Sequence, residues 1–267
     1  MAPQRALSVV VPAFDEAPNV RPLTERLFSA TRAANIDAEL LIADDESAGS
    51  AATAAAVDAL AAEGYAVRLL ARRRAEGRGL SSAVLLAFKQ AQHATLLCMD
   101  ADLQHEPESV PLVAAAVLSG EADFAVGSRN VSGGGVGFEW SLLRRLISHA
   151  ATLLALPLTS ASDPMSGFFA ISKEALARGT GINPLGFKIG LELMVRCGCT
   201  RVVDVPITFQ NRTAGESKLS MRQNFLYLRQ LLGLYIYKLH LDKLGLVGIL
   251  PLVVAAALFA ARGAENM

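Results

Sequence analysis

The sequence predicts an α/β domain built on a mostly parallel sheet with helices on its faces. Short apolar runs alternate with longer stretches of helical character along the first half of the chain. Each apolar run ends in polar residues, and the chain has no internal repeat. Strands that alternate with helices in this way form parallel sheets with right-handed crossovers. The polar ends of the strands should therefore meet at one edge of the sheet.

The first half of the chain supplies the regular part of this pattern. Pro12 stops the first strand, Pro18 can open a helix, Ser50 can cap the next one, and Pro107 lies in a first helical turn. The expected strands are 7–11, 39–43, 67–71, 96–99 and 124–126. The expected helices are 18–34, 50–63, 81–92 and 107–118.

The second half is less regular. Four glycines lie within residues 132–137, and such a segment is expected to form a mobile loop. A turn at 162–167 leads into a strand over 168–172, and residues 202–209 also have a strand pattern. The expected helices are 140–156 and 186–197.

The C-terminal part differs in composition. Residues 244–261 carry no charge, and as a helix they would reach about 27 Å, close to the thickness of about 30 Å of a bilayer core. The stretch 224–241 mixes leucine and tyrosine with basic residues, as interfacial helices do. From Arg212 to Lys243 there are six basic and two acidic residues, which favours anionic lipid on a cytoplasmic face. A core helix that ends a soluble domain is the alternative.

Composition narrows the class of protein. The formal net charge is zero, so bulk charge does not favour a nucleic-acid partner. Hydrophobic residues make up 52% of the chain, which suggests that some of the surface faces lipid. The three cysteines lack metal or redox spacing, and their odd number suggests reduced thiols in the cytoplasm. The first residues show no signal-peptide pattern.

Two carboxylates one residue apart, Asp100 and Asp102, follow the strand expected over 96–99. In an open α/β sheet, ligands bind at the carboxyl ends of the strands. Both carboxylates can turn toward one hard cation, with the amide oxygen of Gln104 as a further ligand. A solvated acidic turn is the alternative, and the neighbouring motifs decide between the two.

Those motifs resemble a known family. The segments VVPAFDE at 10–16, ADDES at 43–47 and MDAD at 99–102 are similar to the nucleotide-sugar half of family 2 glycosyltransferases. The segments DPMSGFF at 163–169 and RTAGESK at 212–218 narrow the resemblance to polyprenol-phosphate mannosyltransferases, the dolichol-phosphate-mannose synthase group. The resemblance covers residues 7–238 and departs at Glu46, where the family usually has glycine. It implies a GT-A-type fold, that of nucleotide-diphospho-sugar transferases.

The resemblance implies a donor site that works with Mg²⁺ or Mn²⁺. A cation held by Asp100, Asp102 and Gln104 would neutralise the departing diphosphate as a Lewis acid. Phe14 could stack on the base, although a core aromatic is the alternative. Asp163 could meet the sugar or its surroundings. The residues implied for the donor are Pro12, Phe14, Glu16, Asp44, Asp100, Ala101, Asp102, Gln104, Glu192, Arg212 and Lys218.

The acceptor implied by the resemblance is a phosphate monoester. Such a group is largely dianionic at pH 7, so it is already a nucleophile and needs positive charge around it. Arg129, Arg144 and Ser148 match the positions of acceptor-phosphate ligands, and arginine suits bidentate phosphate contact. Arg144 and Ser148 lie one turn apart on the expected helix. Surface arginines are the alternative. The expected catalytic residues are Asp102, Arg129 and Arg144.

The expected organisation is a GT-A catalytic domain over 1–220, an amphipathic interfacial helix over 221–243, a hydrophobic membrane anchor over 244–262 and a tail over 263–267. The expected reaction moves mannose from GDP-mannose to a polyprenyl phosphate, with inversion, on the cytoplasmic face of a membrane. A separate protein could supply further membrane helices. The alternatives are UDP-glucose as donor, a hydroxyl acceptor with Asp163 as general base, and a non-catalytic, membrane-tethered nucleotide-sugar binder.

Overall fold

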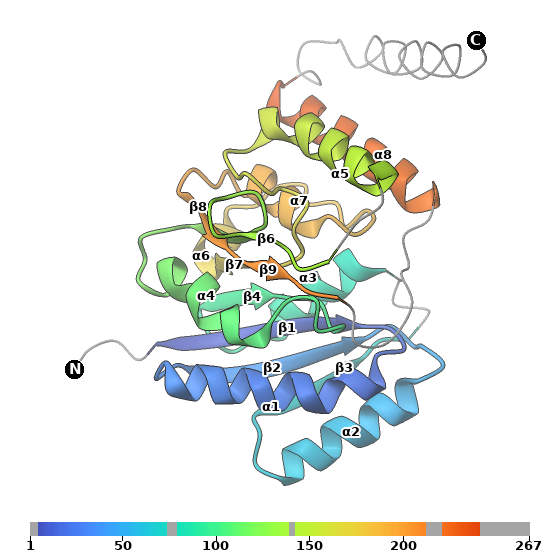
Figure 1. Cartoon of the computed structure of the whole chain (residues 1–267), viewed down its shortest axis with the longest axis vertical. Coiled ribbons are helices and arrows are strands. Elements are labelled where there is room, and N and C mark those ends of the chain that lie inside the picture. The colour runs from blue at the N-terminus through green and yellow to red at the C-terminus, as the bar shows by residue number, and fades with distance from the viewer. Residues whose placement is uncertain (1–4, 74–78, 139–141, 212–220, 241–267) are drawn as a thin grey trace.

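The centre of the molecule is a seven-stranded sheet in the order β3-β2-β1-β4-β7-β5-β8 (Figure 1). The structure is a computed structural model that describes residues 5–73, 79–138, 142–211 and 221–240, apart from the side chains of 142–144 and 221. Its strands are β1 (Ala6–Ala13), β2 (Asp37–Asp44), β3 (Val67–Ala71), β4 (Thr95–Cys98), β5 (Phe124–Ser128), β7 (Phe169–Ser172) and β8 (Val202–Pro206). A second, two-stranded sheet joins β6 (Gly135–Val136) to β9 (Thr208–Phe209).

The strand register brings the ends of several strands to one edge. β1 and β2 are parallel, and Ala13 at the end of β1 pairs with Asp44 at the end of β2. β7 runs antiparallel to both its neighbours, with Phe169 paired to Cys98 of β4 and to Val126 of β5. The segment that precedes β7 therefore reaches the edge at which β1, β2, β4 and β5 end. The predicted mostly parallel sheet is confirmed.

Helices cover both faces of the sheet (Figure 1). They are α1 (Ala17–Ala33), α2 (Ser50–Ala62), α3 (Leu80–Gln90), α4 (Val110–Leu118), α5 (Leu142–Ala155), α6 (Lys173–Ala177), α7 (Ile189–Arg196) and α8 (Met221–Lys238). Side chains of successive strand residues point to opposite faces. Val9 and Val11 of β1 accordingly join one core cluster with α1, α2 and α4, while Val10 joins another with α3, α7 and α8.

Three local predictions are wrong. Residues 202–209 do not form one strand, because the chain changes sheet after Pro206, which has no backbone N–H to continue a ladder. The glycine-rich segment 132–137 contains the paired strand β6 instead of a loop throughout. The N-cap of α2 is Gly49, and the Ser50 hydroxyl instead donates to the Asp44 carboxylate.

Helices α5 and α8 lie side by side at one end of the molecule (Figure 1). The hydroxyl groups of Tyr227 and Tyr235 on α8 donate to the carbonyl oxygens of Ala151 and Leu154 on α5, at 2.7 and 2.8 Å. α8 covers most of the stretch expected to be an interfacial helix. None of the helices in the described ranges is long and apolar enough to cross a membrane, and the expected anchor lies outside those ranges.

Candidate active site

The loop that follows β4 carries the predicted metal ligands. Asp102 is buried, whereas the Asp100 side chain is about one-third exposed, at 34%. Leu103 has a positive φ of 61°, which reverses the chain, and the Gln104 backbone N–H donates to Asp102 Oδ1 at 3.1 Å. The loop thus presents Asp100 at the carboxyl edge of the sheet and holds Asp102 behind it, with Ala101 between them.

The buried ring of His105 holds the main chain of this loop by a hydrogen bond. Burial lowers the pKa of His105 to about 4, so the ring is neutral at pH 7. Its Nδ1 accepts the backbone N–H of Asp100 at 3.2 Å, and the ring packs between Phe168 and Phe209. A neutral imidazole that accepts at Nδ1 fixes the main chain of Asp100 without competing for its carboxylate as a cation would.

Gln104 is oriented by a partner from the other end of the chain. Its Nε2 donates to the Gln210 carbonyl oxygen at 3.0 Å, and the Gln210 N–H donates to the Gln104 carbonyl at 2.9 Å. The side chain of Gln210 donates in turn to Glu106 at 3.0 Å. Because the amide nitrogen donates to Gln210, the side chain is held in one orientation, and Oε1 is the Gln104 atom suited to coordinate a cation.

These donors fit a hard divalent cation. Asp100, Asp102 and Gln104 offer only oxygen, and Mg²⁺ is usually held by one or two carboxylates while substrate phosphates and water complete its shell. The ranges that the structure describes hold no cluster of three or more His, Cys, Asp or Glu suited to a metal. A Cβ at Gly167 would lie 3.2 Å from Asp100 Oδ1, so glycine lets the turn before β7 approach this carboxylate.

Arg129, the first of the predicted acceptor arginines, is held by a buried carboxylate. Arg129 Nε and Nη2 bond Asp163 Oδ2 and Oδ1 at 2.7 and 2.9 Å, and the Arg129 backbone N–H donates to the same group at 3.1 Å. Burial alone would raise the pKa of Asp163, but the Arg129 bonds outweigh it and hold the pKa below its usual value. The Arg129 guanidinium also lies over the Phe209 ring, 5.3 Å from its centroid.

Lys188 is a cation of this site that sequence analysis missed. Its Nζ donates to the Met165 carbonyl oxygen at 2.6 Å, within the turn that approaches Asp100. Burial and, to a lesser extent, the Arg129 charge lower its pKa to about 8, against the opposite effect of the Asp100 and Asp163 carboxylates. Lys188 therefore shares its electrostatic environment with a predicted metal ligand and with the buried ion pair. Lys188 is a single lysine before α7, and no sequence pattern around it identifies it as a site residue.

The predicted nucleoside residues lie where β1 and β2 end. Phe14 is exposed at 37%, which suits a stacking role better than a core role. Glu16 is buried and accepts from the Asn19 side chain at 2.8 Å. Pro12 lies opposite Ala43 in the ladder between these strands. The register thus brings Pro12, Phe14 and Glu16 to the strand edge that also carries Asp44.

The Asp44 carboxylate is buried and accepts from the hydroxyls of Ser47 and Ser50, which ties β2 to the start of α2. Glu46 has a φ of 50° within this turn. Glycine adopts that conformation without strain, which gives the family's usual glycine a physical reason. The turn keeps this shape with glutamate in place.

The Glu192 side chain is buried and makes hydrogen bonds within the protein. It is 1% exposed, and its Oε1 accepts from the Asn183 backbone N–H at 2.9 Å and from Arg196 Nε at 3.3 Å. Its Oε2 accepts from Gln230 Nε2 at 3.2 Å. These contacts make Glu192 a junction between α7, α8 and the chain before α7, and its predicted donor contact stays a prediction.

The remaining predicted residues are placed only in part. Arg144 and Ser148 lie one turn apart on α5, and Ser148 is partly buried. The Arg144 side chain, Arg212 and Lys218 lie outside the described part of the structure. The predicted acceptor clamp and the second half of the diphosphate site therefore stay predictions.

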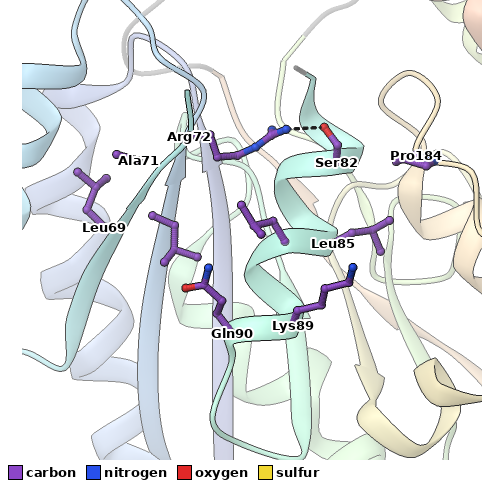
Figure 2. A pocket seen from close by; sticks show the side chains of 10 residues that line it. Leu69, Ala71, Arg72, Ser82, Leu85, Lys89, Gln90 and Pro184 are labelled. Carbon is purple, nitrogen blue, oxygen red and sulfur yellow. Dashed lines mark hydrogen bonds between the residues drawn. The ribbon is translucent and has the colours of Figure 1, made fainter. Parts of the chain in front are cut away.

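A separate groove of about 660 Å³ lies between β3 and α3 (Figure 2). Leucines of both elements line it, with Lys89 and Pro184 at its border. Arg72 at one end is buried, bonds Ser82 at 2.9 Å and forms an ion pair with Asp45 at 2.8 Å. This groove contains none of the predicted site residues.

Comparison with known proteins agrees with this geometry. Residues 8–180 match the sequence model of glycosyl transferase family 2. Over 256 residues the chain is 45% identical to the dolichol-phosphate mannosyltransferase of Mycosarcoma maydis, covering 93% of this chain and 85% of the relative. It is 44% identical to the enzyme of that name from Saccharomyces cerevisiae, covering 89% and 90%. The undecaprenyl-phosphate mannosyltransferase of Micrococcus luteus is 32% identical, with coverage of 79% and 86%.

Solved structures share the fold at lower identity. The glucosyl-3-phosphoglycerate synthase of Mycobacterium tuberculosis, crystallised with Mn²⁺ and UDP-glucose, has a TM-score of 0.58 and 19% identity, with coverage of 88% of this chain and 80% of that one. The mannosyl-3-phosphoglycerate synthase of Rubrobacter xylanophilus has a TM-score of 0.60 and 18% identity, with coverage of 86% and 74%. At these identities the likeness shows a common α/β architecture.

Proposed function

Because this chain belongs to glycosyltransferase family 2, we propose that it transfers mannose from GDP-mannose to the phosphate of a polyprenyl lipid. The observation that carries the proposal is 44–45% identity to two dolichol-phosphate mannosyltransferases over most of both chains. The geometry supports it, because a cluster of oxygen ligands, a partly buried arginine and a lysine meet at the carboxyl edge of the sheet.

The donor half of the reaction needs charge compensation. Asp100, Asp102 and Gln104 would hold Mg²⁺ or Mn²⁺, which when bound would supply Lewis-acid stabilisation to the departing nucleoside diphosphate. Lys188 adds a positive charge at the same edge, and the exposed ring of Phe14 is available to stack on the base. The residues of this chain thus bind and orient the diphosphate.

The acceptor half needs no base. An oxygen of the lipid phosphate forms a bond to the anomeric carbon of mannose while the bond from that carbon to the diphosphate oxygen breaks, and GDP leaves with the electron pair. A phosphate that is already anionic has no proton to lose before attack. The positive charges of Arg129 and Arg144 would reduce the repulsion between the two anionic substrates.

The structure weakens the alternative of a hydroxyl acceptor. That reaction requires a general base with a pKa near the working pH. Asp163, the candidate for that role, is buried and bonded to Arg129 through both oxygens, and its pKa is lowered. A carboxylate held in this way is poorly suited to accept a proton.

We assign the lipid contact to α5 and α8. Leu146, Ile147, Leu153 and Leu154 form an exposed stripe on α5, and Phe225 on α8 is 65% exposed. Neither helix contains an aspartate or glutamate, and both carry exposed arginines. An apolar face with only basic charge is complementary to an anionic membrane surface.

The reaction is tested by donor competition. Membranes that contain the protein are incubated with radiolabelled GDP-mannose, UDP-glucose or UDP-GlcNAc, and the lipid extract is analysed. Labelled polyprenyl-phosphate mannose from GDP-mannose alone is expected, and Asp102→Asn should abolish it. A product from UDP-glucose would favour the rival donor, and a labelled product without a lipid phosphate would remove the proposed acceptor.

Membrane contact is tested by flotation with vesicles of phosphatidylcholine and phosphatidylserine. Leu146→Glu combined with Phe225→Glu should reduce the fraction bound, whereas Leu112→Glu on α4, another exposed leucine at 56%, should not. Equal binding by both variants would exclude α5 and α8 as the lipid face.

A further inference from the structure

Gln230 is a buried amide on α8, where the other buried side chains that the structure describes are Tyr227, Leu231 and Leu234. It is 4% exposed, and its neighbours Tyr227, Leu231 and Leu234 are buried in the core cluster shared with α7. A leucine or methionine would fill this position without the cost of burying an amide. The amide therefore needs an explanation in what it contacts.

Both contacts of Gln230 are made by its Nε2. It donates to the Lys188 carbonyl oxygen at 3.1 Å and to Glu192 Oε2 at 3.2 Å. Within the described ranges, the buried Oε1 of Gln230 has no hydrogen-bond partner. An unpartnered buried oxygen is unfavourable, so the N–H contacts are what this side chain contributes.

The Lys188 carbonyl is at the base of the side chain that reaches the active site. From there the side chain extends to the Met165 carbonyl oxygen, and its charge interacts with Asp100 and Asp163. Glu192 fixes the same stretch from its other end by accepting the Asn183 N–H. One amide on α8 thus anchors the main chain from which Lys188 projects.

We propose that Gln230 is a positioning residue, through which α8 sets the place of Lys188 beside the metal-binding loop. A single buried polar contact between packed elements fixes their register where apolar contacts alone would allow sliding. The inference rests on the proposed function, because in that function Lys188 supplies positive charge beside the diphosphate of the sugar nucleotide. It adds that α8, besides facing lipid, holds the donor site in shape.

The test compares Gln230→Met with Tyr227→Phe. Methionine keeps the volume of glutamine but cannot donate to Lys188 or Glu192. Tyr227→Phe removes one buried hydrogen bond from the same helix, the one to Ala151 on α5, and leaves the Lys188 contact intact. The two variants therefore separate loss of Lys188 positioning from general loosening of α8.

The first readout needs no substrate. The protein is reductively methylated with formaldehyde and cyanoborohydride, and the labelling rate of Lys188 is followed by mass spectrometry. In Gln230→Met this rate should rise about tenfold, the factor that corresponds to losing the buried hydrogen bond to the Lys188 carbonyl. In Tyr227→Phe it should stay near the wild-type rate. Equal rates in the two variants would overturn the proposal.

The second readout is the KM for the sugar nucleotide in detergent with polyprenyl phosphate. Gln230→Met should raise this KM about tenfold, but should have no further effect once Lys188→Gln is present, because the two changes act through one group. A further tenfold rise in this KM when Gln230→Met is added to Lys188→Gln would overturn the proposal. If wild type forms no mannosyl lipid, the proposed function fails, while the labelling rates still decide the role of Gln230.

Discussion

Arg129 and Asp163 form a bidentate ion pair in which the carboxylate is fully buried, with N–O distances of 2.7 and 2.9 Å. The pair joins the end of β5 to the turn that precedes β7. It therefore locks together two segments that both border the predicted metal site. A guanidinium held by two bonds keeps one orientation, which suits a residue expected to meet phosphate.

Asp163→Asn should destabilise the fold strongly, since it leaves the Arg129 charge, on a side chain that is only 14% exposed, without its partner. The free energy of unfolding at pH 7, from urea denaturation, should fall by about 3–5 kcal/mol. Replacing both residues, Arg129→Met with Asp163→Leu, should cost less, because no unpaired charge remains. A double variant less stable than Asp163→Asn would contradict this account of the pair.

The same pair predicts a pH dependence. The pKa of Asp163 is lowered in the folded state, so its carboxylate contributes stability above the unfolded value of 3.8. That contribution is lost as the pH falls through the lower folded value. The stability gap between wild type and Asp163→Asn should hold from pH 8 to pH 5 and close below 3.8. A gap that closes near neutral pH would implicate another group.

Gly167→Ala should weaken metal use. The added methyl would lie 3.2 Å from Asp100 Oδ1 and push this carboxylate out of place. The Mn²⁺ concentration that gives half-maximal transfer should rise about tenfold, as when supporting groups of metal sites are disturbed. Gly233→Ala is the control, because a Cβ there meets nothing within 4 Å. An unchanged Mn²⁺ requirement in Gly167→Ala would separate Asp100 from the metal.

Glu46 offers a test of backbone strain. Its φ is 50°, so Glu46→Gly should be more stable than Glu46→Ala by about 1 kcal/mol, although both variants lose the same side chain. The control position is Ser119, which has a φ of −80°. There the alanine variant should be at least as stable as the glycine variant. The same ranking at both positions would show that the turn relaxes around Glu46.

Lys188→Gln should raise the KM for the sugar nucleotide about tenfold, because it removes a positive charge beside the predicted diphosphate site. Lys89→Gln is the matched control, since Lys89 borders the groove between β3 and α3 (Figure 2). Initial rates at saturating lipid phosphate measure both variants. Equal KM values for the two variants would remove Lys188 from the donor site.

The sheet could be predicted from the sequence up to β4, because in that region the chain alternates regularly between strand and helix. The position of β7 could not. A four-residue strand carries no sign of its direction, and β7 lies between β4 and β5, where Phe169 packs against Phe88 and Phe124 in the core. Strand pairing between distant segments depends on the tertiary fold, so the local sequence pattern does not predict it.

The candidate site divides in the same way. Asp100 and Asp102 lie two positions apart in the sequence, so one short motif is enough to identify both as candidate ligands. The Arg129–Asp163 pair spans 34 positions, and the Lys188–Met165 bond spans 23. Such contacts depend on where the fold brings each segment, so no spacing could identify Lys188. Glu192 differs again: the resemblance implies a donor contact, and only the fold shows that its buried carboxylate joins α7, α8 and the chain before α7.

The strand order has a consequence for how the protein is made. β5 pairs only with β7 and β8, both of which follow it in the chain. A nascent chain that has emerged as far as β5 can assemble β1 to β4, but β5 has no sheet partner until the ribosome has delivered β7. The edge that bears the predicted catalytic residues is therefore completed late in synthesis, after the turn at 163–167 has emerged. Until then β4 and β5 are both open to wrong pairing, which is the hazard of sheets closed by distant strands.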